Sequence, residues 1–244
     1  GALSFPNPWL ADLDKKMPAI ARKHFPKKSI EYDVFPNCFL LAEKIRDWVN
    51  MNNCPYETII YDSITSLCNL IIRSIGEAKG ESALQLLQQL QTTSSGKKQV
   101  EMLGIDYYNA EVRFMDWFME SNKILYSRPG NPKNIIFTAH ILTVESAPDI
   151  KTKVVTRTRS IVTSGKKVAA YIPTQFDEVF LFGTSQEGGL SINDPVKQKH
   201  KMLTITTGED DAKTAFMLSQ ETDFTDASLY DKLMAQIRGK EMFI

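Results

Sequence analysis

Residues 56–63 read Tyr-Glu-Thr-Ile-Ile-Tyr-Asp-Ser, and this stretch is the strongest indication of the fold class. Its centre is β-branched and apolar, as in a buried strand, and the run ends abruptly at Asp62. Apolar residues then recur at the spacing of one helix face from Ile64 to Ile75. A buried strand that leads directly into an amphipathic helix is the repeating unit of a parallel α/β sheet.

The same pattern of strand and helix occurs before this stretch. Residues 9–14 form a short apolar run that ends in acidic residues, which predicts a buried parallel strand. Residues 30–34 alternate between apolar and polar, and Asn37 then offers a helix N-cap. Residues 39–49 carry apolar side chains at helical spacing. We therefore expect two further strands and one further helix here.

Helical segments also separate the central strand from the next one along the chain. Residues 76–104 form a Gln- and Ser-rich helical stretch with a break at 92–98, and residues 106–126 form an amphipathic helix. Residues 135–139 are a further apolar strand, which ends at His140. Parallel strands need a helix or a comparable crossover between them. The predicted fold class is therefore α/β, with a mostly parallel sheet covered by helices on both faces.

The sequence pattern changes in the second part of the chain. Short β-like runs at 154–162, 179–182 and 202–206 are separated by turns rich in Gly, Ser and Asn. This pattern favours a partly antiparallel extension over a second domain. We expect one domain, with a core of sheet and helices over 1–148 and C-terminal strands with a terminal helix over 149–244.

Composition excludes several classes of protein. The 29 basic and 29 acidic residues of this 244-residue chain cancel, so whole-chain charge favours no polyanionic partner. The longest apolar runs are far shorter than the roughly 18 residues that a membrane-spanning helix needs. Three scattered cysteines are too few for a disulfide framework, and we expect them to be reduced and structural. A soluble, cytoplasmic protein without a membrane segment is expected.

Polar side chains follow three of the predicted strands at their carboxyl ends, where open parallel sheets bind ligands. They are Asp12 and Asp14 after the first strand, Asp62 and Ser63 after the next, and His140 after the last. A carboxylate at such an edge suits a partly hydrated Mg²⁺ ion. Simpler roles remain open: Asp62 as a helix N-cap, Asp12 as a second acid or a helix cap, and His140 as a buried histidine with satisfied hydrogen bonds.

Five segments in this order resemble the phage RecA-like, AAA-type P-loop ATPases of DNA recombination. They are residues 2–14, which resemble the end of the P-loop helix and the following strand, 56–63 (the Walker B strand), 134–140 (the sensor strand), 165–179 and 206–213. The resemblance implies a RecA-like fold, ATP and Mg²⁺ as cofactors, and a role in recombination or single-strand annealing. It also implies single-stranded DNA as partner, a homo-oligomer, and the cytoplasm of a bacterial host.

The resemblance also implies roles for individual residues. Asp62 would be the Mg²⁺-side carboxylate, with Ser63 beside the nucleotide, and Asp14 would orient the attacking water. RecA-like enzymes have a longer glutamate at the position of Asp14. His140 would sense the γ-phosphate, and Lys213 would be either a cationic finger on the transferred phosphoryl group or a solvated surface lysine.

The phosphate-binding loop that this resemblance requires does not occur in the sequence. The motif Gly-x-x-x-x-Gly-Lys-Ser/Thr is absent, since residues 96–98 and 165–167 lack its hydroxyl residue and preceding glycine. We expect the sequence to begin just inside the P-loop helix, and the chain without that loop to bind nucleotide poorly. A truncated gene, an insertion in the loop and a genuine loss remain alternatives. Alternative functions are a non-catalytic nucleotide- or DNA-binding module and a packaging or helicase motor.

The segment from Lys151 to Lys167 is locally basic. It contains no acidic residue and several hydroxyl residues, which suit phosphate contacts with single-stranded DNA. Aromatic residues for base stacking are nearly missing, Tyr171 being the closest, so a solvated hairpin face is the alternative. The predicted DNA-binding residues are Lys151, Lys153, Arg157, Arg159, Lys166 and Lys167.

Overall fold

The computed structural model forms two compact units. The sheet unit comprises Pro6–His140 and Ile161–Val168, and the terminal unit comprises Gly1–Phe5, Ile141–Ser160 and Ala169–Ile244. The residues that the structure describes are 2–24, 30–77, 104–145, 157–163, 166–187, 197–205 and 212–241. Apart from its two ends, the predicted Gln- and Ser-rich helical stretch lies outside the described residues.

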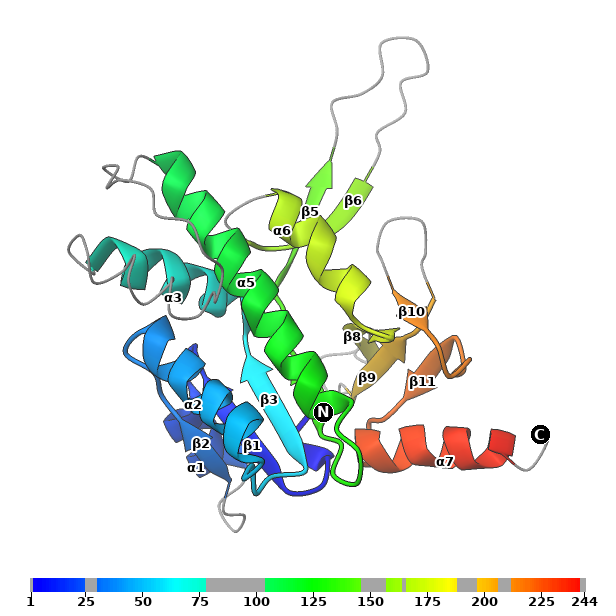
Figure 1. The fold of residues 1–244 in the computed structure, drawn as a ribbon. Coiled ribbons are helices and arrows are strands. Elements are labelled where there is room, and N and C mark those ends of the chain that lie inside the picture. The colour runs from blue at the N-terminus through cyan, green and yellow to red at the C-terminus, as the bar shows by residue number, and fades with distance from the viewer. Residues whose placement is uncertain are drawn as a thin grey trace. The chain divides into compact units, whose positions relative to one another are not determined.

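The sheet unit is built on four parallel strands in the order β2-β1-β3-β4 (Figure 1). Asp12 at the end of β1 lies opposite Asp62 at the end of β3. Both strands therefore end at the same edge of the sheet. The strands are β1 (Pro8–Asp12), β2 (Glu31–Asp33), β3 (Thr58–Asp62) and β4 (Asn134–Phe137).

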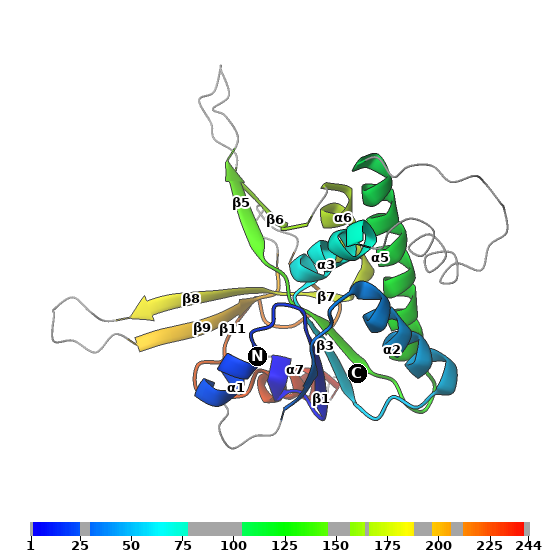
Figure 2. The same ribbon diagram turned by 90° about the vertical axis from the view of Figure 1, so that its left-hand side faces the viewer.

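Helices cover both faces of this sheet, as the sequence predicts. The chain steps from β1 to β2 in one direction and then returns past β1 to β3 and on to β4. Right-handed crossovers therefore place the first helix on one face and the later helices on the other. Figure 2 shows α1 on one face and the other three helices on the second. The helices are α1 (Met17–His24), α2 (Cys38–Met51), α3 (Ile64–Glu77) and α5 (Gly104–Tyr126). The predicted α/β class is confirmed.

Side chains from the strands and from α5 form the core between them. Ile59, Ile60 and Tyr61 of β3 are fully buried, because this strand is covered on both faces. Tyr61 makes an edge contact with Phe118 of α5 at 4.8 Å and stacks on Phe137 of β4 at 4.6 Å between ring centroids. These contacts hold α5 against the centre of the sheet.

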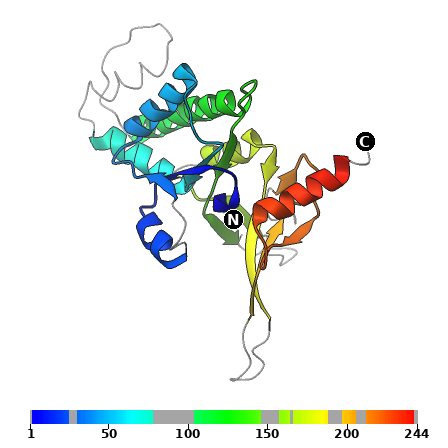
Figure 3. The same cartoon turned by 90° about the horizontal axis from the view of Figure 1, so that it is seen from below.

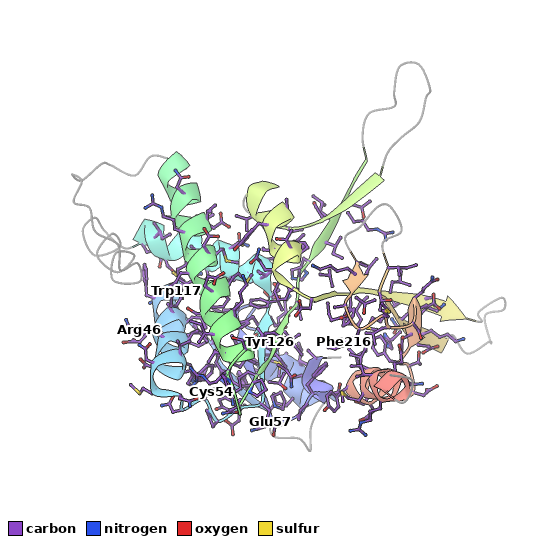
Figure 4. The ribbon with its side chains drawn as sticks, turned by 45° about the vertical axis from the view of Figure 1, so that its right-hand side comes forward. Arg46, Cys54, Glu57, Trp117, Tyr126 and Phe216 are labelled. Atoms are coloured by element: carbon purple, nitrogen blue, oxygen red, sulfur yellow. The ribbon has the colours of Figure 1, made fainter. Side chains whose placement is uncertain are left out.

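The predicted N-cap of α2 is confirmed. The side chain of Asn37 accepts a hydrogen bond from the backbone N–H of Leu40 at 3.0 Å. Cys54 and Glu57 lead into β3 at the amino-terminal end of that strand (Figure 4), and Lys133 bonds to the backbone there. The buried Lys133 ammonium donates to the Cys54 carbonyl at 3.0 Å. The three cysteines are free thiols and buried, as expected.

The terminal unit consists of short strands and one long helix. β8 (Leu181–Glu187), β9 (Lys197–Leu203) and β11 (Glu221–Asp223) form an antiparallel sheet. Helix α7 (Leu229–Glu241) lies against this sheet (Figure 3) and buries Leu229 and Leu233 with Met202 of β9. The remaining elements are η1 (Ala2–Ser4), β5 (Ile141–Glu145), β6 (Arg157–Ile161), α6 (Lys166–Tyr171), η2 (Ile172–Gln175), β7 (Glu178–Val179) and β10 (Lys213–Thr214).

The antiparallel pairing that the sequence predicts for the C-terminal strands is confirmed, in sheets separate from the parallel one, and the prediction of a single domain stays a prediction. β8 pairs with β9, β9 with β11, and β7 with β10, all in antiparallel register. Within the part of the chain that the structure describes, no helix is long and apolar enough to cross a membrane.

Candidate functional site

The turn that follows β1 is held by the carboxylate of Asp12. This side chain is fully buried, and its two oxygens accept the backbone N–H groups of Lys16 at 3.0 Å and Met17 at 2.9 Å. Free N–H groups at the start of a helix need such acceptors, and Met17 is the first residue of α1. Of the two roles that the sequence left open for Asp12, the geometry supports the helix cap.

Asp14 lies two residues further on, beside the end of β3. The backbone N–H groups of Leu13 and Asp14 both donate to the carbonyl oxygen of Asp62, at 2.9 and 3.2 Å. The next residue, Lys15, adopts a left-handed conformation with φ of 58°, which turns the chain towards α1. The Asp14 carboxylate is therefore fixed at the edge of the sheet, with 6% of its side chain exposed.

Four side chains surround the carboxylate of Asp14. Its Oδ1 accepts hydrogen bonds from Ser63 at 3.3 Å and from Ser66. Its Oδ2 pairs with the Lys16 ammonium at 2.8 Å and lies 3.4 Å from Nε2 of His140. Burial raises the pKa of Asp14, but the hydrogen bonds with Lys16 and Ser66 and the charge of Lys16 outweigh it and lower this pKa from 3.8 to about 2. Asp14 is therefore ionised at neutral pH.

Asp62 ends β3 beside the end of β4. Its Oδ1 accepts a hydrogen bond from the hydroxyl of Thr138, the residue after β4. The backbone of Thr138 bonds on both sides, donating to the Tyr61 carbonyl at 3.0 Å and accepting from Ile64 N–H at 2.8 Å. The peptide bond between Asp62 and Ser63 is cis. Among the described residues, no group donates a hydrogen bond to the second carboxylate oxygen of Asp62.

His140 lies at the rim of the site and is not a buried histidine. Its side chain is 55% exposed, and its backbone N–H donates to the hydroxyl of Thr65 at 3.3 Å. Because Thr65 is in the first turn of α3, the same turn that carries Ser66 also holds His140. The imidazole thus faces solvent on one side and Asp14 on the other.

The structure brings together Asp14, Asp62, Ser63 and His140, as the sequence predicts from the carboxyl ends of parallel strands. The Ser63 hydroxyl is buried and also accepts the backbone N–H of Ser66 at 3.3 Å, which caps α3. Contact of Ser63 with a nucleotide stays a prediction.

The other predicted site residues lie elsewhere in the chain. Lys213 is in β10 of the terminal unit, paired with Val179, and its role as a cationic finger stays a prediction. Arg157 and Arg159 are on β6, and Lys166 and Lys167 begin α6. The remaining two predicted DNA-binding residues, Lys151 and Lys153, lie outside the described residues.

Sequence reasoning missed three residues of the site. Lys16 and Ser66 bond to Asp14, and Thr138 bonds to Asp62. Ser66 had a signal in the sequence, because residues three apart share one face of a helix turn and Ser63 precedes it by three. Lys16 and Thr138 had none that distinguishes them from a surface lysine and a strand threonine.

The chemistry of this edge suits a hydrated divalent cation. Within the described residues, no group of three or more His, Cys, Asp or Glu side chains is arranged to hold a metal ion. Mg²⁺ in nucleotide sites does not need such a group, since it is bound by one or two carboxylates, water and the phosphates of the substrate. The second oxygen of Asp62 is a ligand of that kind.

Comparison with known proteins gives one match over most of the chain. The sequence model of the family described as AAA domain matches residues 1–215. No curated protein matches the chain.

Proposed function

Because the chain belongs to the AAA domain family of P-loop NTPases, we propose that the edge of its parallel sheet is an ATP-binding and ATP-hydrolysing centre. One observation carries this proposal. Asp62, the last residue of β3, and Asp14, two residues after the adjacent parallel strand β1, are joined by a backbone hydrogen bond at the carboxyl end of the sheet, with His140 beside Asp14. Ligands of open α/β sheets bind at this end.

Each of the three side chains has its own role in the proposed reaction. Asp62 presents an oxygen to Mg²⁺, and the ion, when bound, neutralises charge on the phosphate oxygens. Asp14 is ionised and accepts a hydrogen bond from the attacking water, which it thereby orients. The exposed ring of His140 donates to the terminal phosphate. Asp14 is one methylene shorter than the glutamate of RecA-like enzymes, and its backbone N–H bonds to the Asp62 carbonyl, which fixes the start of this shorter side chain beside the end of β3.

The test is Mg²⁺-dependent ATP hydrolysis by the wild-type chain and by Asp62→Ala. The motif Gly-x-x-x-x-Gly-Lys-Ser/Thr does not occur in these 244 residues, so the protein is made with any residues that the gene encodes before Gly1. We expect Asp62→Ala to lower turnover by on the order of 10²-fold or more, since it removes a group that acts on transition-state charge. The matched control is Asp116→Ala, an exposed aspartate on α5. Equal turnover in Asp62→Ala and wild type refutes the role of Asp62.

As the biological setting we propose ATP-dependent recombination or annealing of single-stranded DNA in a phage, by a homo-oligomer. The terminal unit offers a groove of about 400 Å³ lined by Arg159, by Lys201, which is ion-paired with Glu221 at 2.7 Å, and by the half-exposed Phe182. Cations beside an exposed aromatic ring suit a single strand, whose phosphates bind the cations and whose bases stack on the ring. Greater stimulation of ATP hydrolysis by duplex DNA than by single strands would favour a packaging or helicase motor instead.

DNA binding by the predicted basic segment is tested by its salt dependence. Each phosphate contact in a single strand contributes about 0.7 to the slope of log affinity against log salt. The double substitution Arg157→Ala with Arg159→Ala should therefore weaken binding of a fluorescent oligonucleotide and reduce the slope by about 1.4. The control is Arg113→Ala, an exposed arginine of α5. An unchanged slope would mean that this strand is a solvated surface.

A further inference from the structure

We propose that Ser66 is a positioning residue for Asp14, an inference that rests on the proposed ATPase function. Ser66 lies in the first turn of α3 and donates its hydroxyl hydrogen bond to Oδ1 of Asp14. It does not reach the reacting atoms by itself and acts through the carboxylate. Its effect is to decide which oxygen of Asp14 faces the site.

The partners of the two Asp14 oxygens differ in kind. Oδ1 is bonded by the hydroxyls of Ser63 and Ser66, which belong to the end of β3 and the start of α3. Oδ2 is bonded by Lys16 and His140, whose side chains are 59% and 55% exposed. Oδ1 is thus anchored to the scaffold, whereas Oδ2 is on the solvent side, where water and a phosphate can enter. We infer that Oδ2 is the oxygen that receives the attacking water.

Ser66 is a better candidate for this role than Ser63. The oxygen of Ser63 already accepts the backbone N–H of Ser66, so a substitution there would also uncap α3. Ser63 is next to Asp62, the proposed Mg²⁺ ligand, and its loss would disturb both acids. Among the described residues, the Ser66 hydroxyl bonds with the side chains of Asp14 and Ser63 and with no backbone group, so its removal leaves the cap of α3 in place.

In a short acid a single anchor is enough to orient the carboxylate, because aspartate has fewer side-chain torsions than glutamate. Asp14 has one methylene fewer than the glutamate of RecA-like enzymes, so its reach is set by the backbone and by the rotation of its carboxylate. An error of about 1 Å in the position of a catalytic group can lower the rate by on the order of 10²-fold. A hydroxyl that holds Oδ1 from a rigid helix turn restricts that rotation.

The experiment compares Ser66→Ala and Ser66→Thr with the wild-type protein. We expect Ser66→Ala to lower kcat by about 10-fold or more, with KM for Mg²⁺·ATP within about twofold, because the lost contact acts only on the attacking water. Threonine keeps the hydroxyl, so Ser66→Thr should restore kcat to within about threefold of wild type. The control is Ser127→Ala, because the Ser127 hydroxyl donates to the Lys123 carbonyl at the end of α5, away from the site.

Two measurements without turnover separate positioning from folding and from nucleotide contact. The thermal unfolding midpoint and the Kd for a non-hydrolysable ATP analogue should be the same in Ser66→Ala and wild type. A kcat of Ser66→Ala equal to that of wild type overturns the role of Ser66 and leaves the ATPase proposal intact. A weaker Kd assigns Ser66 to the nucleotide and also overturns it. A wild-type protein that hydrolyses no ATP overturns both proposals.

Discussion

Replacement of Asp12 with alanine should destabilise the sheet unit without a direct effect on chemistry. The carboxylate is buried and accepts the N–H groups of Lys16 and Met17, which begin α1. In the variant both groups lose their acceptor. Asp12 is thus expected to affect stability, whereas Asp62 is expected to affect turnover.

The size of the effect follows from the surroundings of the two N–H groups. A hydrogen bond to a charged group contributes about 1.5–3 kcal/mol. Met17 is buried, so its N–H would remain unsatisfied, whereas water can reach the N–H of Lys16, whose side chain is largely exposed. We expect a loss of about 3 kcal/mol in the free energy of unfolding, more than the roughly 0.5–2 kcal/mol of an ordinary N-cap, because two hydrogen bonds to a buried charge are lost. Asp12→Asn keeps one acceptor and should lose about half as much.

Urea unfolding followed by tryptophan fluorescence measures this loss in the relevant unit. The three tryptophans, Trp9, Trp48 and Trp117, all lie in the sheet unit, so their emission reports on that unit alone. Asp116→Ala serves again as the exposed control and should change stability by less than about 0.5 kcal/mol. A loss below about 1 kcal/mol in Asp12→Ala would refute the capping role.

Three further predictions concern acid stability, thiol chemistry and a helix end. The pKa of Asp14 is lowered from 3.8 to about 2, so its ionised form stabilises the fold above about pH 4, and this contribution is lost as pH falls towards 2. The difference in unfolding free energy between wild type and Asp14→Asn should therefore shrink between pH 4 and 2, and a constant difference would contradict this. Burial raises the pKa of Cys38 to about 12, so this thiol should not react with a disulfide reagent at pH 8 until urea is added, and rapid labelling of the folded protein would disprove its burial. Arg128 donates to the Trp48 and Val49 carbonyls at the end of α2, at 3.1 and 2.6 Å, so Arg128→Ala should lower the free energy of unfolding by about 1–2 kcal/mol. Urea unfolding measures this loss, and the exposed Arg113→Ala should show none.

The strands of the parallel sheet could be predicted because burial on both faces demands apolar residues. β3 follows this rule, whereas β4 is apolar but only half-buried, and both lie within one or two residues of the predicted runs. The end of β1 could not be predicted in the same way. Residues 9–14 have the pattern of one strand, but β1 ends at Asp12. The carboxylate of Asp12 accepts N–H groups at the start of α1, and the N–H groups of the two residues after Asp12 bond to the Asp62 carbonyl.

The acids of the site could be predicted from their place after apolar runs, but their partners could not. Thr138 was part of the predicted strand 135–139, and only the register of β3 and β4 shows that it follows the strand and faces Asp62. Lys16 reaches Asp14 because Lys15 adopts a left-handed conformation, which no pattern of hydrophobicity reveals. In the terminal unit, the three-residue strand β11 pairs with β9, and so short a strand has no periodic pattern by which the sequence could predict it.

A single oxygen, the carbonyl of Asp62, accepts two successive N–H groups from the turn after β1. β1 and β3, which are neighbours in the sheet, are thereby joined at the edge where Asp14 and Asp62 lie. A displacement of the last peptide of β3 strains these two hydrogen bonds and so acts on the backbone of Asp14. We therefore expect the carboxylates of Asp14 and Asp62 to move together.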